Sequence, residues 1–255
     1  MSGEVVMAVR QLDTRFGSHV IHERLDLEVR RGEILGIVGG SGTGKSVLLN
    51  TMLGLKSPDG GAIYFEGRDM AAMTEADRDA IETRWGVLFQ GAALFSSLTV
   101  KENVLAPLRE HADMPDSLRE EIAEMKIGLV GLSPEAANKF PAELSGGMKK
   151  RAGLARSLAL DPDVLFLDEP TAGLDPISAS QFDELLLELS PTLGLTVVLV
   201  THDLDTLHAV CDRVAVLAER RVVACAPLSE VVADAHPWIR EYFSGPRGRA
   251  ALREA

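Results

Sequence analysis

One glycine-rich stretch constrains the fold of this chain more than any other segment. It fits the phosphate-binding pattern G-x-x-x-x-G-K-[ST], follows an apolar run at residues 34–38 and precedes residues 47–53, which predict a helix. The matching residues are Gly39, Gly40, Ser41, Gly42, Thr43, Gly44, Lys45 and Ser46. A strand that leads through glycines into a helix N-terminus forms an anion site, because backbone N–H groups and the helix dipole favour negative charge there. The alternative is a tight strand–helix turn with chance glycines.

This pattern predicts a P-loop that binds a nucleoside triphosphate together with Mg²⁺. The ammonium group of Lys45 is expected to reach the β- and γ-phosphates. The hydroxyl of Ser46 is expected to bind the metal ion.

Two neighbouring carboxylates, Asp168 and Glu169, follow a second apolar strand at residues 164–167. A parallel strand delivers such residues to the carboxyl edge of the sheet, where a P-loop also opens. We therefore expect Asp168 to hold Mg²⁺ and Glu169 to polarise a water molecule aimed at the γ-phosphate. The alternative is that the two acids cap the next turn.

A second glycine-rich turn, at residues 144–148, precedes another predicted helix. Ser145 can cap that helix, and the pair Gly146 and Gly147 exposes backbone N–H groups, so this turn is a second phosphate site. One nucleotide cannot easily use both turns within one chain, and the simplest solution is a dimer that shares nucleotides across its interface. An ordinary N-capped helix after a loop is the alternative.

The remaining pattern predicts an α/β fold with a mainly parallel sheet. Residues 5–30 predict two antiparallel strands, and residues 91–160 predict an inserted helical subdomain with helices near 101–110, 117–130 and 146–160. Ordinary crossover helices are the alternative for this insertion. Strands and helices alternate again from Val164, as a parallel sheet requires. We expect a single domain over residues 1–240 and a loose tail over 241–255.

The bulk composition excludes some classes of function. The 255 residues carry a formal net charge of −12, which argues against nucleic acid as a partner, so we expect Lys149, Lys150 and Arg151 to form a solvated helix face near phosphate. No apolar run approaches the roughly 18 residues of a membrane span, and the N-terminus lacks a secretory signal. Cys211 and Cys225 predict buried, reduced thiols. These features indicate a cytosolic protein whose membrane role, if any, comes through a partner.

Taken in order, these motifs resemble those of an ABC-type ATPase subunit over about residues 5–235. The resemblance implies an adenine-stacking role for Phe16, a role for Gln90 in linking the helical subdomain to Mg²⁺ and water, and a γ-phosphate contact for His202. Residues 172–175 resemble the loop that crosses the dimer interface. The resemblance implies three groups of site residues: a catalytic group of Glu169, His202 and Gln90, a magnesium group of Ser46, Gln90 and Asp168, and a nucleotide group of Phe16, residues 39–46, Val47, Ser145, Gly146 and Gly147.

Departures from the commonest family pattern point to one branch of that family. Met148 replaces glutamine in the signature turn, and Gly40 and Val47 stand where proline and threonine are frequent. Together with residues 90–95 and 107–111, these departures resemble the ATPases of Mla-like transporters, which move phospholipids or other apolar molecules with MCE-domain partners. The resemblance implies ATP and Mg²⁺ as cofactors and a homodimer bound to two integral membrane permease subunits at the cytoplasmic face of the inner membrane.

Other functions stay open at this point. An importer of a polar solute uses the same kind of ATPase, and a soluble ABC protein acting on DNA or ribosomes is a further alternative, although such relatives usually carry two cassettes or a long coiled coil. A scaffold that binds but barely hydrolyses ATP is disfavoured, because Glu169 and His202 are both present. The apolar segment at residues 90–108, with Leu98 and Val104, is expected to dock a membrane partner. Burial of these apolar residues in the core is the alternative.

Overall fold

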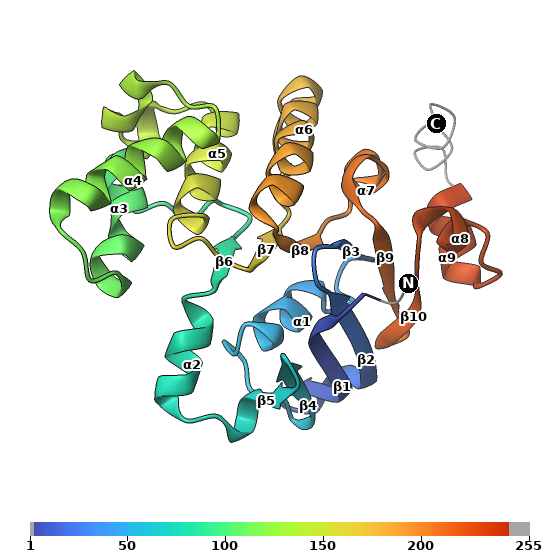
Figure 1. Ribbon diagram of the computed structural model, residues 1–255. Helices are drawn as coiled ribbons and strands as arrows, with labels where there is room; N and C mark the ends of the chain where they lie inside the picture. The colour runs from blue at the N-terminus through green and yellow to red at the C-terminus, as the bar shows by residue number, and fades with distance from the viewer. Residues whose placement is uncertain (1–2, 245–255) are drawn as a thin grey trace. The chain divides into compact units, whose positions relative to one another are not determined.

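The computed structural model describes residues 3–244 and divides the chain into two compact units (Figure 1). The first unit combines residues up to Arg78 with those from Thr196 onward, and the second comprises Asp79–Leu195. The helix α2, Glu75–Glu82, runs across the boundary between them. Strands and helices occur in both units, so the predicted α/β class is observed.

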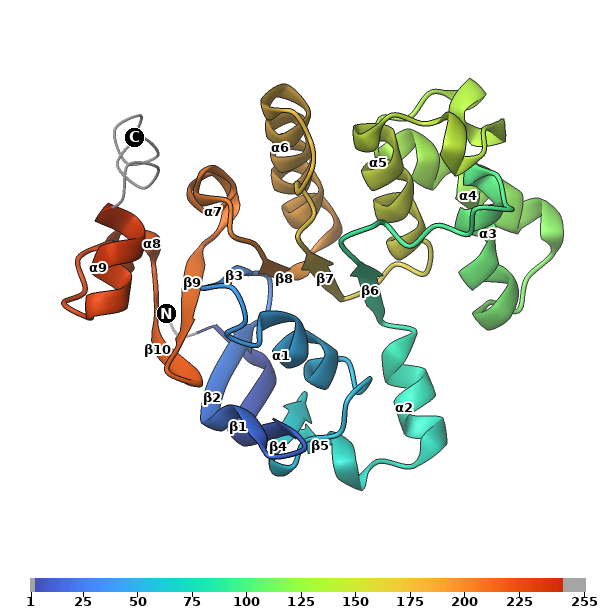
Figure 2. The ribbon, with the colours of Figure 1, turned by 180° about the vertical axis from the view of Figure 1, so that it is seen from behind.

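The first unit begins with an antiparallel sheet of order β2-β1-β4-β5. Its strands are β1 Val5–Phe16, β2 His19–Arg30, β4 Gly60–Phe65 and β5 Arg68–Asp69. The predicted hairpin of residues 5–30 is present, and β1 and β2 lie side by side in the view from behind (Figure 2). Along β2, exposed or half-buried residues alternate with the buried Leu25, Leu27 and Val29, which is the period-two pattern of a strand with one face on the core.

A second sheet in the same unit has the order β10-β9-β3-β8. Its strands are β3 Ile34–Gly39, β8 Thr196–Val200, β9 Arg213–Ala218 and β10 Arg221–Ala226. β3 pairs in parallel with both β8 and β9, while β10 returns antiparallel beside β9. Every residue of β3 and of β8 is buried, as expected for parallel strands with both faces covered. β3 therefore places its carboxyl end, where the glycine-rich loop begins, on a rigid support.

The helices of the first unit follow strands of this second sheet. They are α1 Lys45–Met52, α7 Leu204–Val210, α8 Leu228–Val232 and α9 Pro237–Ser244, with a short 3-10 turn η1 at Met70–Ala72. The expectation of a loose tail from residue 241 is wrong for residues 241–244, which belong to α9. They are helical because Ile239 and Phe243 bury their side chains in the core of the unit. Residues 245–255 lie outside the described residues.

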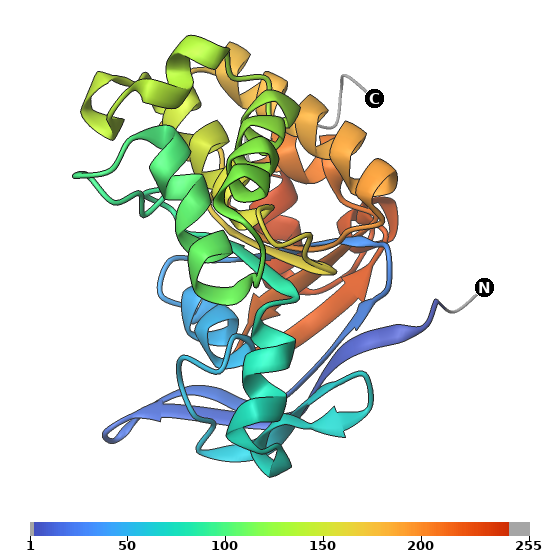
Figure 3. The same cartoon turned by 60° about the vertical axis from the view of Figure 1, so that its left-hand side comes forward.

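The second unit contains two strands and the helical segment. Its elements are β6 Trp85–Leu88, α3 Val100–His111, α4 Asp116–Leu129, η2 Pro134–Asn138, η3 Pro141–Glu143, α5 Gly146–Ser157, β7 Val164–Asp168 and α6 Pro176–Leu193. β6 and β7 pair in parallel. The three predicted helices are present, and α3, α4 and α5 pack together (Figure 3).

Capping residues fix where these helices begin. The Thr99 hydroxyl accepts a hydrogen bond from the Glu102 backbone N–H, and the Glu102 carboxylate accepts one from the Thr99 N–H at 2.7 Å, which is a complete capping box for α3. Asp175 caps α6 by accepting from the backbone N–H of Ser178 at 3.0 Å.

The structure also bears on two expectations that do not concern the site, the state of the cysteines and the lack of a membrane span. Cys211 and Cys225 are free thiols, as expected, but they are half-buried, so the expectation that they are buried is wrong. Cys225 accepts a hydrogen bond from Arg213 at 3.0 Å. Across residues 3–244, none of the helices combines the length and apolar character needed to span a bilayer.

Candidate nucleotide-binding and hydrolysis site

The glycine-rich loop has the backbone conformation that its glycines allow. Gly42 and Gly44 adopt φ values of 78° and 96°, in a region that residues with a side chain rarely adopt. There is no room for a side chain at Gly39, because a Cβ atom there would lie 2.5 Å from the Leu217 carbonyl oxygen. The loop leads directly into α1, whose first residue is Lys45, so its amides lie at a helix N-terminus.

Side chains of the loop hold its shape. The ammonium of Lys45 donates to the carbonyls of Gly39 at 2.8 Å and of Gly40 at 3.1 Å, and the Thr43 hydroxyl donates to Gly40 at 2.9 Å. Of the other loop residues with predicted roles, Ser41 and Ser46 are exposed, whereas Val47 is half-buried in α1. The Lys45 side chain thus lies along the loop, with its ammonium held by two carbonyls of the loop.

A buried histidine supports the loop from the antiparallel sheet. His22 of β2 is fully buried, and its Nδ1 lies 2.8 Å from the Thr14 hydroxyl of β1. A Cβ atom at Gly44 would lie 2.6 Å from His22 Nε2 and 2.4 Å from Ile21 Cγ2, so the loop closes directly over these two side chains. The pKa of His22 is lowered to about 4, and burial is the largest cause. A hydrogen bond with the Gly44 backbone opposes this shift, and the Lys56 charge adds to it. The sequence pattern gave no sign of this contact.

The predicted base platform and γ-phosphate contact both lie in the first unit. Phe16, at the end of β1, is 59% exposed, and the Lys56 ammonium lies 5.3 Å from its ring centroid. An aromatic face this exposed is available to a stacking partner. His202 follows β8, and its side chain is exposed. On either side of it, the backbone N–H of the half-buried Asp203 donates to the hydroxyl of the buried Thr201 at 3.0 Å.

The paired carboxylates lie in the second unit, at the end of β7. Asp168 is the last residue of the strand and Glu169 follows it, both half-buried, as the sequence predicts for the carboxyl edge. Glu169 adopts φ 49°, a left-handed conformation that costs a residue with a side chain roughly 1–2 kcal/mol. Its carbonyl accepts hydrogen bonds from Ala172 N–H at 3.2 Å and from the Lys150 ammonium at 2.8 Å.

The expectation that Lys150 belongs to a solvated helix face is wrong. Lys150 is 5% exposed rather than solvated, and its ammonium donates to the backbone carbonyls of both Gln90 and Glu169. Burial lowers its pKa, while the charges of Glu169 and Asp168 oppose that shift. Arg151 is also engaged, donating to the Val130 carbonyl at 2.7 Å. Helical spacing carried the missed signal, because residue 150 shares a face of α5 with the buried Leu154.

The second glycine-rich turn forms a capped helix start. The Ser145 hydroxyl accepts from the Met148 N–H at 3.3 Å, as predicted for an N-cap. Gly146 is exposed and Gly147 half-buried, so this end of α5 offers N–H groups to an anion. The Gln90 side chain is exposed, and its backbone is held to the same helix by Lys150.

The predicted magnesium ligands suit a metal that arrives with its nucleotide. Among the described residues, no three His, Cys, Asp or Glu side chains gather as a self-sufficient metal site. Mg²⁺ typically takes one or two carboxylates and completes its shell with substrate phosphates and water. A hydroxyl from Ser46, an amide from Gln90 and a carboxylate from Asp168 are all oxygen donors of this kind.

A phosphate loop on a buried parallel strand, and a carboxylate pair at a strand end, define a P-loop nucleotide hydrolase. The sequence comparison places the chain more narrowly: residues 22–172 match the family described as "ABC transporter". The chain belongs to the ABC transporter family and is an ATP-binding ATPase of that family.

Individual relatives agree over most of the chain. The intermembrane phospholipid transport system ATP-binding protein MlaF of Escherichia coli K12 is 38% identical over 247 residues, which covers 96% of this chain and 91% of MlaF. A probable ribonucleotide transport ATP-binding protein, mkl, of Mycobacterium leprae is 37% identical over 95% of this chain and 70% of its own length. A solved dimeric ATP-binding cassette bound to ADP and Pi is 29% identical, with a TM-score of 0.78 over 87% of this chain and 98% of that chain.

Proposed function

We propose that this ATPase drives phospholipid movement by a membrane transporter, as a homodimer bound to two permease subunits and an MCE-domain partner at the cytoplasmic face of the inner membrane. The similarity to MlaF, which spans 96% of this chain and 91% of MlaF, is the observation that carries this proposal. The signature residue Met148 and the segment at residues 90–95 support the same branch.

Each ATP is cleaved, in this proposal, between the two phosphate-binding turns of different copies. Phe16 stacks on adenine, Lys45 binds the β- and γ-phosphates, and Glu169 orients the attacking water. His202 contacts the γ-phosphate as it leaves. Ser46, Gln90 and Asp168 would hold Mg²⁺, which would supply positive charge beside the phosphates. The backbone conformations of Gly42, Gly44 and Glu169, all with positive φ, support these roles, because they set the direction of groups at two strand ends.

A groove on the second unit is the proposed docking surface for the permease. It has a volume of about 430 Å³ and brings together apolar and charged side chains. Phe95, which is 54% exposed, lines it, and the Arg156 guanidinium lies 5.8 Å from the Phe95 ring centroid. Val104, expected from the sequence to dock a partner, is fully buried and belongs to the core of the unit. Leu98 is half-buried.

Co-expression with the permease tests this surface. Phe95→Glu should abolish co-purification of the permease while leaving ATP hydrolysis by the isolated chain unchanged, because it adds charge to the groove alone. Phe140→Glu is the matched control, since Phe140 is 43% exposed in the same unit and does not line the groove. Retention of the permease by the Phe95 variant, or equal loss in both variants, would contradict docking at this groove.

The other relative suggests a second candidate cargo, because it is named a probable ribonucleotide transport ATP-binding protein. Mass spectrometry of the small molecules that co-purify with the whole transporter distinguishes the two candidates. Phospholipid in the complex supports the proposal, whereas ribonucleotides, or another polar solute, in the partner subunits would replace it.

A further inference from the structure

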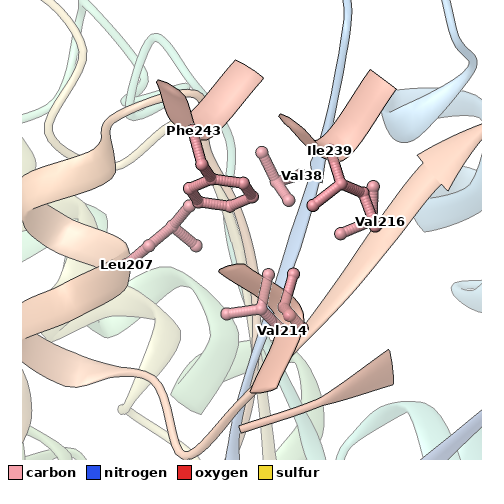
Figure 4. Close-up of a cluster of buried hydrophobic side chains, with 7 residues drawn as sticks. Val38, Leu207, Val214, Val216, Ile239 and Phe243 are labelled. Atoms are coloured by element: carbon pink, nitrogen blue, oxygen red, sulfur yellow. The ribbon is translucent and has the colours of Figure 1, made fainter. Parts of the chain in front are cut away.

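Helix α9, the last helix among the described residues, packs beside the strand that carries the phosphate loop. Ile239 is fully buried and Phe243 is 3% exposed, and both belong to a core cluster that includes Val38 of β3 (Figure 4). Val38 lies one residue before the first glycine of the loop. Burying two large apolar side chains contributes several kcal/mol, so α9 is a fixed part of this unit.

On the adjacent face of α9, Trp238 and Tyr242 form a stacked pair. Their ring centroids are 4.7 Å apart with an interplanar angle of 16°. The pair has one contact at each end. A Cβ atom on Gly40 would lie 3.7 Å from Trp238 Nε1, so the indole packs against the second residue of the loop. The Tyr242 hydroxyl donates to the backbone carbonyl of His202 at 3.1 Å.

We infer that Tyr242 is a positioning residue for His202. We further infer that the Trp238–Tyr242 stack connects the position of His202 to that of the phosphate loop. The inference rests on the proposed γ-phosphate contact of His202. Neither aromatic side chain was singled out by the sequence motifs, because α9 lies beyond them in the chain.

The physical reason lies in the backbone at His202. β8 ends at Val200, so His202 lies two residues beyond the end of the strand. Thr201 is tied to β3 through its N–H, which donates to the Ile37 carbonyl at 3.3 Å, and its hydroxyl accepts from Asp203. The Tyr242 hydroxyl adds a hydrogen bond from an independently anchored helix. Fixing the carbonyl of His202 limits the directions in which its exposed imidazole can point.

Removing only the hydroxyl tests this role in the full-length protein. Tyr242→Phe keeps the ring that stacks on Trp238, and we expect kcat for ATP hydrolysis to fall about 3- to 10-fold, the scale of one lost hydrogen bond. ADP affinity and the thermal midpoint should stay unchanged, because the loop and the core are intact. Tyr64→Phe is the matched control, since Tyr64 is the other of the two tyrosines and lies on β4. A merely structural role would lower the midpoint and ADP affinity together with kcat.

His202→Ala separates failure of this inference from failure of the proposed function. If His202→Ala reduces kcat at least tenfold while Tyr242→Phe keeps wild-type kcat, Tyr242 does not position His202 and the inference is overturned. If His202→Ala itself keeps wild-type kcat, the proposed γ-phosphate contact is wrong and the inference falls with it.

Tryptophan fluorescence tests the other end of the stack without any turnover. The chain has two tryptophans, so Trp85→Phe leaves Trp238 as the sole emitter. A non-hydrolysable ATP analogue should change the emission of this variant saturably, because the indole packs against the loop that binds phosphate. Lys45→Ala in the same background should remove the response. Unchanged Trp238 emission at a concentration where calorimetry shows that the analogue binds would overturn the proposed tie to the loop.

Discussion

The ammonium of Lys150 donates a hydrogen bond of 2.8 Å to the carbonyl of Glu169. That carbonyl belongs to a residue held at φ 49°, directly after the strand that ends in Asp168. The same ammonium donates to the carbonyl of Gln90, so one buried cation joins the signature helix α5 to two residues with predicted catalytic roles. A cation that satisfies two carbonyls at once can stabilise a backbone conformation that would otherwise be strained.

We expect Lys150→Met to lower ATP turnover by about tenfold or more, the scale of losing hydrogen bonds to a charged group. Methionine fills a similar volume without donors, so Glu169 and Gln90 lose their common partner. Lys150→Arg should recover part of the turnover, because it restores a cation with N–H donors. Steady-state hydrolysis and nucleotide binding should be measured for both variants, with Lys149→Met as control on the same helix. Normal turnover in Lys150→Met would show that the contact is dispensable.

The carboxylate of Glu169 has its own prediction. Glu169→Gln keeps the size of the side chain and the backbone contacts but removes the charge that polarises water. Turnover should fall by at least about 10²-fold, the usual scale for such a group, while ATP binding is retained. Single-turnover hydrolysis and ATP titrations measure the two effects separately. Wild-type turnover in this variant would exclude Glu169 as the water-orienting residue.

Residues whose role depends on local backbone chemistry could be predicted from the sequence. The glycines at 42 and 44 have positive φ values, and Asp168 ends a buried strand, because pattern and spacing determine both features. Ser145 is an N-cap for the same reason.

Contacts between distant segments could not be predicted in this way. Lys150 meets a carbonyl 60 residues earlier in the chain, and the run of basic residues around it is more typical of a solvated surface. His22 lies under Gly44 only because β2 crosses beneath the loop. Tyr242 reaches His202 across 40 residues. Each contact depends on tertiary packing between distant segments, which the local spacing of residues does not encode.

His22 should make the stability of the protein dependent on pH. Its folded-state pKa of about 4 lies below the ordinary value of 6.5, so the unfolded chain binds a proton that the native state excludes. The contribution of His22 to the unfolding free energy is therefore fully present above pH 6.5 and is lost as the pH falls towards 4. Between pH 7 and pH 5 this one group should cost about 2 kcal/mol of unfolding free energy.

His22→Gln isolates this contribution, because glutamine has no titrating group and can still hydrogen-bond to Thr14. Urea unfolding of both proteins at pH 7, 6 and 5 gives the difference in unfolding free energy at each pH. The stability of the wild type relative to the variant should decline as the pH falls. A difference that stays constant from pH 7 to pH 5 would mean that His22 is not kept neutral by burial.

The last prediction concerns how two copies of the chain share their ATP sites. The phosphate loop belongs to the first unit, and the signature turn belongs to the second. A two-fold interface is self-complementary, so the loop of one copy can face the turn of the other, twice. Lys45→Ala damages the loop and Ser145→Arg fills the turn, and each variant alone should be inactive.

Mixing the two variants should restore hydrolysis. In a mixed dimer the Ser145→Arg chain supplies an intact loop and the Lys45→Ala chain supplies an intact turn, so one site is whole and the other is doubly broken. With random exchange half the dimers are mixed, and independent sites would recover about a quarter of wild-type hydrolysis. ATP-dependent dimerisation should be measured beside turnover, because coupling between the sites lowers this value. Activity in the Ser145→Arg homodimer alone would contradict sharing, as would a mixture that exchanges subunits and yet neither dimerises with ATP nor hydrolyses it.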